Sequence, residues 1–256
     1  MPYIGRFAPS PTGPLHFGSL ITAVASYCDA KANQGKWLVR IEDTDIPRIY
    51  PNSENHIRSC IDAFQFEPDA EIICQKDRLE IYEQVLEQLK HLDAIYACQC
   101  TRKILGSNHI YVGTCRDLHL DFNDQAIRLK VADQLICFED RLQGQQSANL
   151  KHDLGDFVLK RRDGIMSYQL AVVVDDYLQG ITHVVRGADL LDNTVRQIWL
   201  GSLLNYPSLH YMHLPLAMNH QGQKLSKQNL AQALDISNAS NLLQQAILAL
   251  GQPLVE

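Results

Sequence analysis

The chain of 256 residues has the size of one large domain, or of two small ones that share a core. Hydrophobic residues make up 46% and charged residues 20% of it, which excludes a fibre, a mini-protein and a disordered chain. Its net charge of −6 argues against a broad, sequence-blind electrostatic grip on nucleic acid, while a local basic patch stays compatible with it.

The opening segment predicts one βαβ unit. Residues 3–7 are short and apolar, residues 9–14 are rich in Pro and Gly and predict a turn, and residues 15–32 favour a helix of small and apolar side chains. Residues 36–41 then have the continuous apolar character of a buried strand. Such a unit implies a parallel sheet.

The alternation of helices and strands continues. Ser53 is placed to cap one helix and Asp77 another, with a short strand predicted between them at residues 71–74. From residue 97 to residue 156 the pattern breaks into a cysteine-bearing loop, short strands such as 126–131, and a polar stretch at 143–149. This break indicates a module inserted into the sheet.

Regular alternation then returns up to the end of the chain. The predicted strands are residues 157–161, 181–185 and 211–218, and the predicted helices are residues 168–178, a segment from Gly187 through Trp199, and the tail. We therefore expect an α/β fold with a doubly wound, Rossmann-type parallel sheet. Its catalytic core would comprise residues 1–96 and 157–256, with residues 97–156 as the inserted module.

The start of the first helix has the features of an anion site. A strand that ends in a Pro- and Gly-rich turn and leads into a helix directs free backbone N–H groups and the helix dipole at one point. His16, Gly18 and Ser19 stand there; Gly18 admits a ligand close to the backbone, and the other two can donate to phosphate oxygens. A capped helix with incidental polar residues is the alternative interpretation.

Lys224 and Lys227 lie three residues apart beside a predicted turn at residues 219–222. Two mobile cations in such a position suit a charged phosphate chain, although two surface lysines alone are more often merely solvated.

Both segments together resemble the signature motifs of the class I aminoacyl-tRNA synthetases. Residues 6–19 (RFAPSPTGPLHFGS) resemble the HIGH motif and residues 224–227 (KLSK) the KMSKS motif. Four further segments are similar to the glutamyl-tRNA synthetase catalytic domain: RIEDTD at 40–45, DFVL at 156–159, VVDD at 173–176 and VRGAD at 185–189. The second His of HIGH is Ser19 here and the closing Ser of KMSKS is Gln228, so stabilisation of the pyrophosphate side of the transition state is expected to differ.

Only 29 residues follow Lys227, so we expect no anticodon-binding domain after it. The chain resembles most closely the truncated paralogues that act as glutamyl-queuosine tRNA(Asp) synthetases. The resemblance implies an ATP-dependent ligase that activates L-glutamate without tRNA and esterifies it to the cyclopentene-diol of queuosine in tRNA(Asp). A truncated synthetase that charges the tRNA 3′ end, and a catalytically dead paralogue that binds RNA, are the rival hypotheses.

The resemblance also implies roles for individual residues. The glutamate site would comprise Arg6, Phe7, Ala8, Pro9, Ser10, Glu42, Tyr168 and Arg186, and the ATP site His16, Gly18 and Lys227, with Mg²⁺ accompanying ATP. The catalytic groups would be His16, Ser19, Lys224 and Lys227. Side-chain chemistry agrees in part, because a zwitterion with a second carboxylate needs both arginines and a carboxylate around it.

Three of the seven cysteines, Cys98, Cys100 and Cys115, cluster in the inserted module and suggest a structural Zn²⁺. Zinc needs a fourth ligand. Side-chain chemistry alone favours His109, whereas the resemblance favours Tyr111. A cluster of reduced thiols without metal is the alternative.

No apolar run reaches the roughly 18–20 residues of a membrane span, and the N-terminus shows no secretory signal. We therefore expect a cytoplasmic protein without membrane partners, and a monomer rather than an oligomer.

Overall fold

The computed structural model of the chain describes residues 2–101, 110–216 and 233–253. It divides into two compact units, each described by itself below. Unit 1 comprises Met1–Gln75, Ile181–Leu190 and Leu209–Glu256. Unit 2 comprises Lys76–Gly180 and Leu191–Ser208. The division into a core and an inserted module at residues 97–156 stays a prediction.

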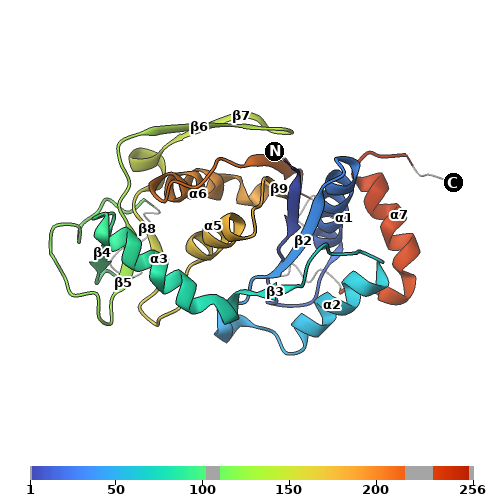
Figure 1. The fold of residues 1–256 in the computed structure, drawn as a ribbon, viewed down its shortest axis with the longest axis horizontal. Coiled ribbons are helices and arrows are strands. Elements are labelled where there is room, and N and C mark those ends of the chain that lie inside the picture. Colours follow the sequence, from blue (N-terminus) through green and yellow to red (C-terminus); the bar gives the residue numbers. More distant parts are fainter. Residues whose placement is uncertain (1, 102–109, 217–232, 254–256) are drawn as a thin grey trace. The chain divides into compact units, whose positions relative to one another are not determined.

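Unit 1 is built on a parallel sheet, of which Figure 1 shows β1 and β2 in blue, β3 in teal and β9 in orange. Its strands are β1 (Ile4–Phe7), β2 (Lys36–Ile41), β3 (Ile73–Cys74), β9 (His183–Gly187) and β10 (His210–Leu214), in the order β3-β2-β1-β9-β10. The chain adds strands on one side of β1 first and on the other side later, so the order reverses between β1 and β9. Open α/β sheets bind ligands at the carboxyl ends of strands beside such a reversal.

The helices of unit 1 are α1 (Phe17–Ala32), α2 (Ser53–Ala63) and α7 (Ala239–Ala249). Trp37 of β2 is fully buried, and its indole N–H donates to the Ser26 hydroxyl of α1 at 2.9 Å. Gly35 directly precedes this strand, and a Cβ atom added to Gly35 would stand 2.4 Å from the Tyr3 carbonyl oxygen. Only glycine therefore allows β1 and β2 to approach as closely as they do.

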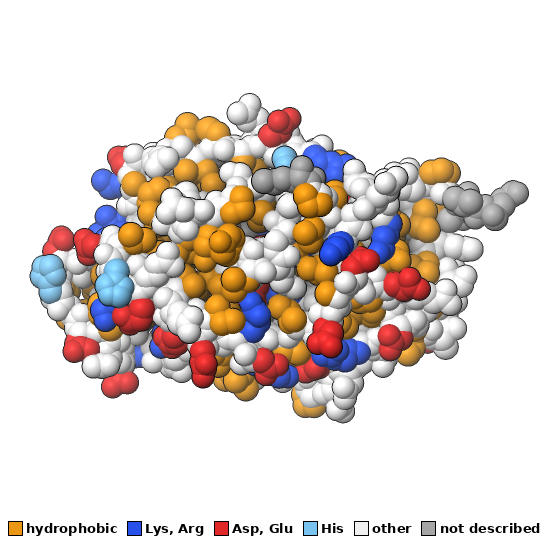
Figure 2. Space-filling model, viewed as in Figure 1, with side chains coloured by type: hydrophobic (Ala, Val, Ile, Leu, Met, Phe, Trp, Pro, Cys, Tyr) orange, Lys and Arg blue, Asp and Glu red, His pale blue; other side chains and the backbone are white. Residues whose placement is uncertain are grey.

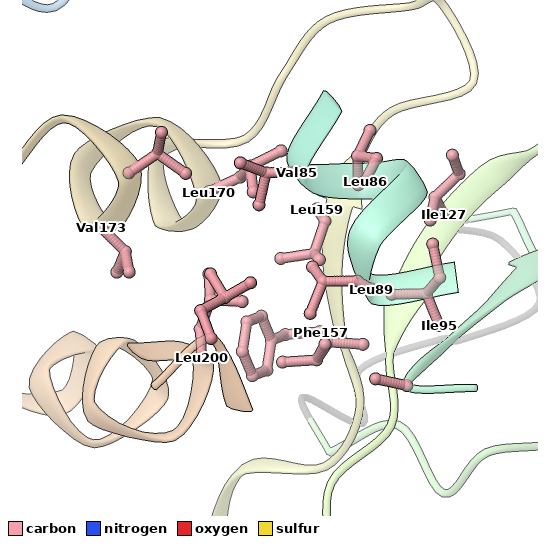
Figure 3. Packing of buried hydrophobic residues seen from close by; sticks show 14 of the residues in the cluster. Val85, Leu86, Leu89, Ile95, Ile127, Phe157, Leu159, Leu170, Val173 and Leu200 are labelled. Atoms are coloured by element: carbon pink, nitrogen blue, oxygen red, sulfur yellow. The ribbon is translucent and has the colours of Figure 1, made fainter. Parts of the chain in front are cut away.

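Unit 2 combines antiparallel strands with helices. The strands β4 (Ile95–Cys98), β5 (Ala126–Leu129) and β8 (Phe157–Lys160) form a sheet in the order β4-β5-β8, and β6 (Leu135–Asp140) and β7 (Gly144–Asn149) form a hairpin. The helices are α3 (Leu79–His91), α5 (Tyr168–Leu178) and α6 (Leu191–Leu203). Leu89, Leu159, Leu170 and Leu200 are fully buried where these elements meet (Figure 3).

Short helical turns complete the chain: 3₁₀ turns at Ile46–Arg48, Gln75–Arg78, Ala188–Leu190 and Ile236–Asn238, and a π turn at Leu150–Leu154.

Most predicted elements are confirmed, and three details are wrong. Ser53 is the first residue of α2 and not its N-cap, which is Asn52, and the Ser53 hydroxyl donates to the Pro11 and Tyr50 carbonyl oxygens. The polar stretch at 143–149 is a strand, β7, paired with β6 across a turn in which Asp140 accepts from the backbone N–H groups of Leu142 and Gln143. Among its side chains only Ala148 is apolar, so the sequence shows no alternation of apolar and polar residues that would predict a strand. Helix α3 begins at Leu79 after a 3₁₀ turn, with Arg78 and not Asp77 at its N-cap.

Two surface properties bear on function. Among the described residues, no helix is both long and apolar enough to cross a membrane. On the face shown in Figure 2, Lys and Arg side chains are interspersed with Asp and Glu. That mixture fits the net charge of −6.

Candidate functional site

Three charged side chains gather at the carboxyl ends of neighbouring strands in unit 1. Arg6 lies in β1, Glu42 directly follows β2, and Arg186 lies near the end of β9. Because β2, β1 and β9 are adjacent and parallel, these residues share one edge of the sheet, at the point where strand order reverses. This is the place where such sheets bind ligands.

Both arginines are almost fully buried, with exposed fractions of 3% for Arg6 and 4% for Arg186. Arg6 Nη1 donates to the Val185 carbonyl oxygen at a long 3.4 Å. Arg186 Nε donates to His213 Nε2 at 3.0 Å, and these two residues are register partners across β9 and β10. A guanidinium has no acceptor atom, so His213 Nε2 must carry a lone pair and its ring proton sits on Nδ1.

Glu42 is held beside the loop that follows β1. Its backbone N–H donates to the Pro9 carbonyl oxygen at 3.0 Å, which joins the end of β2 to that loop. Its carboxylate lies 3.4 Å from Nη2 of the fully buried Arg40. Unit 1 thus presents the buried guanidinium groups of Arg6 and Arg186 and the carboxylate of Glu42, beside a third guanidinium from Arg40, at one sheet edge. Cations together with an anion suit the charges of an acidic amino acid.

The other residues predicted for the glutamate site are placed as follows. Phe7 belongs to the core, where its ring stacks on Trp37 with centroids 6.2 Å apart, so only its backbone is available to a ligand. Ala8 and Ser10 are half-buried on the loop after β1. Tyr168 belongs to unit 2, as the first residue of α5, behind the Ser167 N-cap.

The N-terminus of α1 has the geometry of an anion site. His16 is the N-cap, and its Nδ1 accepts from the Ser19 backbone N–H at 3.3 Å. This bond leaves the ring proton on Nε2, which makes that atom a donor for a phosphate oxygen. His16, Gly18 and Ser19 are all half-buried at this end of the helix, as the strand–turn–helix pattern predicts.

Lys224, Lys227 and His109 lie outside the described residues. The chain beyond the two lysines is anchored near the same helix start, because Leu234 N–H donates to the Leu15 carbonyl oxygen at 2.9 Å.

A second candidate site lies in unit 2, where three thiols meet one phenol. The sulfur atoms of Cys98, Cys100 and Cys115 lie within 4.8 Å of one another. Tyr111 Oη lies 3.4 Å from the sulfurs of Cys98 and Cys100 and accepts from the Cys115 backbone N–H at 3.1 Å. Three thiolates and an oxygen donor around one point fit a tetrahedral metal ion.

The residues of this cluster shift one another's pKa values. Burial, and then hydrogen bonds to the three thiols, raise the pKa of Tyr111 far above its usual range. Burial alone would raise the pKa of Cys115, but hydrogen bonds from Tyr111, the Gln99 backbone and Cys100 outweigh it and lower that pKa. One thiol is therefore predisposed to be a thiolate, the form in which cysteine binds metals.

The backbone around Tyr111 depends on a glycine. Gly155 has a φ of +66° and bridges to Tyr111, and a Cβ atom there would stand 2.5 Å from the Tyr111 carbonyl oxygen. The next residue, Asp156, donates its N–H to that same oxygen at 3.0 Å. The phenol is thus positioned by a contact that sequence spacing does not reveal.

Asp43, Glu54 and Cys74 form a third group of acidic and thiol side chains, in unit 1. A cationic side chain, Arg58, contacts two of them. Arg58 Nη2 donates to Glu54 Oε1 at 3.1 Å and to Cys74 Sγ at 3.9 Å. This cation accounts for the closeness of Glu54 and Cys74 without a metal.

Comparison with known proteins agrees with the charge pattern of the first site. Residues 4–250 match the catalytic domain of the class I tRNA synthetases (E and Q). The chain is 76% identical over 254 residues to a glutamyl-Q tRNA(Asp) synthetase of Acinetobacter baylyi, covering 99% of this chain and 87% of that protein. It is 50% identical over 265 residues to a protein of the same name from Dechloromonas aromatica, covering 100% and 88%.

Among solved structures, a glutamate tRNA ligase of Elizabethkingia meningosepticum in complex with its amino acid aligns with a TM-score of 0.79 and 30% identity. The alignment covers 90% of this chain and 53% of that one, so the chain spans about half the length of that ligase. The chain therefore belongs to the class I tRNA synthetases (E and Q), and within them to the family of the glutamyl-Q tRNA(Asp) synthetases.

Proposed function

We propose that this chain activates L-glutamate with ATP and transfers it to queuosine in tRNA(Asp). The observation that carries the proposal is the placement of Arg6, Glu42 and Arg186 at adjacent strand ends, where strand order reverses. The identity with relatives named glutamyl-Q tRNA(Asp) synthetase supplies the specific substrate and acceptor.

In the first step the glutamate α-carboxylate attacks the α-phosphorus of ATP. A P–O bond to the α-phosphorus forms, the bond between the α- and β-phosphates breaks, and pyrophosphate leaves. Arg6 and Arg186 would bind carboxylate oxygens of glutamate, and Glu42 its ammonium group, so that the attacking oxygen is held in position. Ala8, Pro9, Ser10 and the Phe7 backbone would contact glutamate in unit 1, and Tyr168 of unit 2 is a further proposed glutamate-binding residue.

The phosphate chain of ATP would lie at the start of α1. His16 Nε2–H and Ser19 can donate to phosphate oxygens, and Gly18 lets the chain come close to the backbone. Lys224 and Lys227 would neutralise the charge that develops on the leaving pyrophosphate. Mg²⁺ bound with ATP would supply further charge neutralisation on the phosphates.

In the second step a hydroxyl oxygen of the queuosine cyclopentene-diol attacks the carbonyl carbon of the adenylate. An ester C–O bond forms, the bond between the carbonyl carbon and the phosphate oxygen breaks, AMP leaves and the hydroxyl proton is released. Recognition of an unstacked anticodon base by shape suits a surface of mixed charge.

We further propose that Cys98, Cys100, Tyr111 and Cys115 hold a structural Zn²⁺. Their three sulfurs and one oxygen supply the donor set and the coordination number that structural zinc requires. When bound, the ion would tie β4 to the segment that follows it and so stabilise the fold of unit 2.

Glutamate-dependent exchange of label between pyrophosphate and ATP tests the first step. The enzyme is freed of RNA by nuclease and compared with Lys227→Ala. Exchange by the wild type alone is the expected result. No exchange without RNA, followed by exchange once tRNA is added, would contradict the proposal and indicate an enzyme that needs tRNA to activate glutamate.

A further inference from the structure

Arg128, in the middle of β5, touches two of the four proposed metal ligands. Its exposed fraction is 7%, and it stands opposite Tyr96 of β4 in the antiparallel register. Its Nε donates to Cys98 Sγ at 3.2 Å. Its guanidinium carbon lies 4.0 Å from the centre of the Tyr111 ring, on the ring face. One cation therefore contacts both a sulfur ligand and the oxygen ligand.

The orientation of Arg128 is fixed by the backbone. Its Nη1 donates to the Asp156 carbonyl oxygen at 2.9 Å. The Asp156 carboxylate is occupied elsewhere, by Tyr96 Oη at 2.6 Å, by Arg116 Nε at 2.6 Å and by the Val131 backbone N–H at 2.9 Å. Arg116 thus pairs with this carboxylate, which leaves the charge of Arg128 directed at the thiol cluster.

A charge count explains why a cation is needed at this place. Three thiolates around Zn²⁺ leave an excess negative charge in a buried position, and an uncompensated buried charge is costly. The planar guanidinium serves three contacts at once, through Nε, through Nη1 and through its flat face on the Tyr111 ring. A lysine ammonium would supply the positive charge, but it lacks the planar group and the separate N–H donors that make these contacts.

We propose that Arg128 is a positioning residue of the metal site, which balances the charge of the thiolates and holds the Tyr111 ring, and so determines how tightly the site retains zinc. This inference rests on the proposed zinc site and goes beyond its ligand set.

The test measures zinc affinity by competition with a colorimetric chelator. Arg128→Met keeps an unbranched stem as far as the position of Nε and removes the charge and all N–H donors. We expect zinc affinity about 10–100-fold weaker than in the wild type, the range found when outer-shell partners of metal ligands are removed. Arg128→Lys should give an intermediate value. In cobalt-loaded protein the same variants should shift the sulfur-to-cobalt absorption, because the hydrogen bond to Cys98 is lost.

Tyr96→Phe is the matched control. It removes a buried hydrogen bond to Asp156 from the facing strand but keeps the ring and leaves every ligand contact intact, so its zinc affinity and cobalt spectrum should match the wild type. Wild-type affinity and spectrum in folded Arg128→Lys and Arg128→Met would overturn the inference, as would an equal loss in Tyr96→Phe. A wild type that contains no zinc would overturn the metal site itself, and with it the role of Arg128. Glutamate activation is a separate assay whose outcome does not affect this result.

Discussion

The two candidate sites are built in different ways. At the sheet edge of unit 1, the contacts of the buried Arg6 and Arg186 include a carbonyl oxygen of β9 and a ring nitrogen of β10. In unit 2, Cys98 and Tyr111 lie within a continuous network that includes Arg128 and the backbone of Asp156.

This difference indicates different tasks. A substrate site gains affinity when the substrate's own charges complete the pattern of cations and anions that the protein presents. A structural metal site must keep its ion permanently, so its ligands are fixed before the ion arrives. Substitutions should therefore affect the reaction in the first region and metal retention in the second.

The largest effect is expected at His16. His16→Asn keeps an N-cap acceptor for the Ser19 backbone N–H but loses the Nε2–H donor. We expect the rate of glutamate-dependent ATP–pyrophosphate exchange to fall by about 10²–10³-fold, the usual cost of one lost donor at a developing charge.

Thermal unfolding supplies the control for His16→Asn. The Tm should stay near that of the wild type, since the cap is kept, whereas His16→Ala should lower both rate and Tm. An active His16→Asn would exclude a phosphate-binding role for this ring.

Gly155→Ala should disrupt the proposed metal site of unit 2. The added methyl group meets the Tyr111 backbone at 2.5 Å and occupies a φ of +66°, so the bridge to Tyr111 must open. We expect a zinc content well below one equivalent in purified protein, together with a lower Tm. Gly164→Ala, at a positive φ with open space around it, controls for backbone strain alone; equal zinc loss in both variants would contradict the account.

The smallest of these effects is expected at His213. His213→Leu removes the acceptor of Arg186 Nε, and a hydrogen bond to a charged group is worth about 1.5–3 kcal/mol. The KM for glutamate should rise by about tenfold or more while the KM for ATP stays unchanged.

His213→Gln tests the cause, since its amide oxygen can accept the same bond and should restore most of the affinity. His210→Gln, at the exposed first residue of the same strand, is the control. If His213→Leu binds glutamate as well as the wild type does, His213 does not position Arg186.

The sequence predicts those features that depend on residues adjacent to one another in the chain. The helix over Tyr168–Leu178 was predicted with its observed bounds, because Ser167 caps it and apolar side chains follow. The anion site at α1 follows from its strand, turn and helix. The sequence does not predict the strand at Gly144–Asn149, because its apolar and polar residues do not alternate.

Partnerships across strands could not be predicted. Arg186 faces His213, and Arg128 faces Tyr96, only through strand register, which fixes contacts between residues far apart in the chain. Nor does spacing choose Tyr111 as a ligand; its oxygen reaches the thiols because Gly155 and Asp156 hold its backbone.

The most direct test of the central claim is the destination of glutamate on tRNA. Labelled glutamate, ATP and the enzyme are incubated with tRNA(Asp) that carries or lacks its 3′-terminal adenosine, in each case once with queuosine at the wobble position and once with guanine. We predict labelling of the queuosine-containing tRNA alone. Labelling that requires the 3′-terminal adenosine and ignores the wobble base would contradict the account.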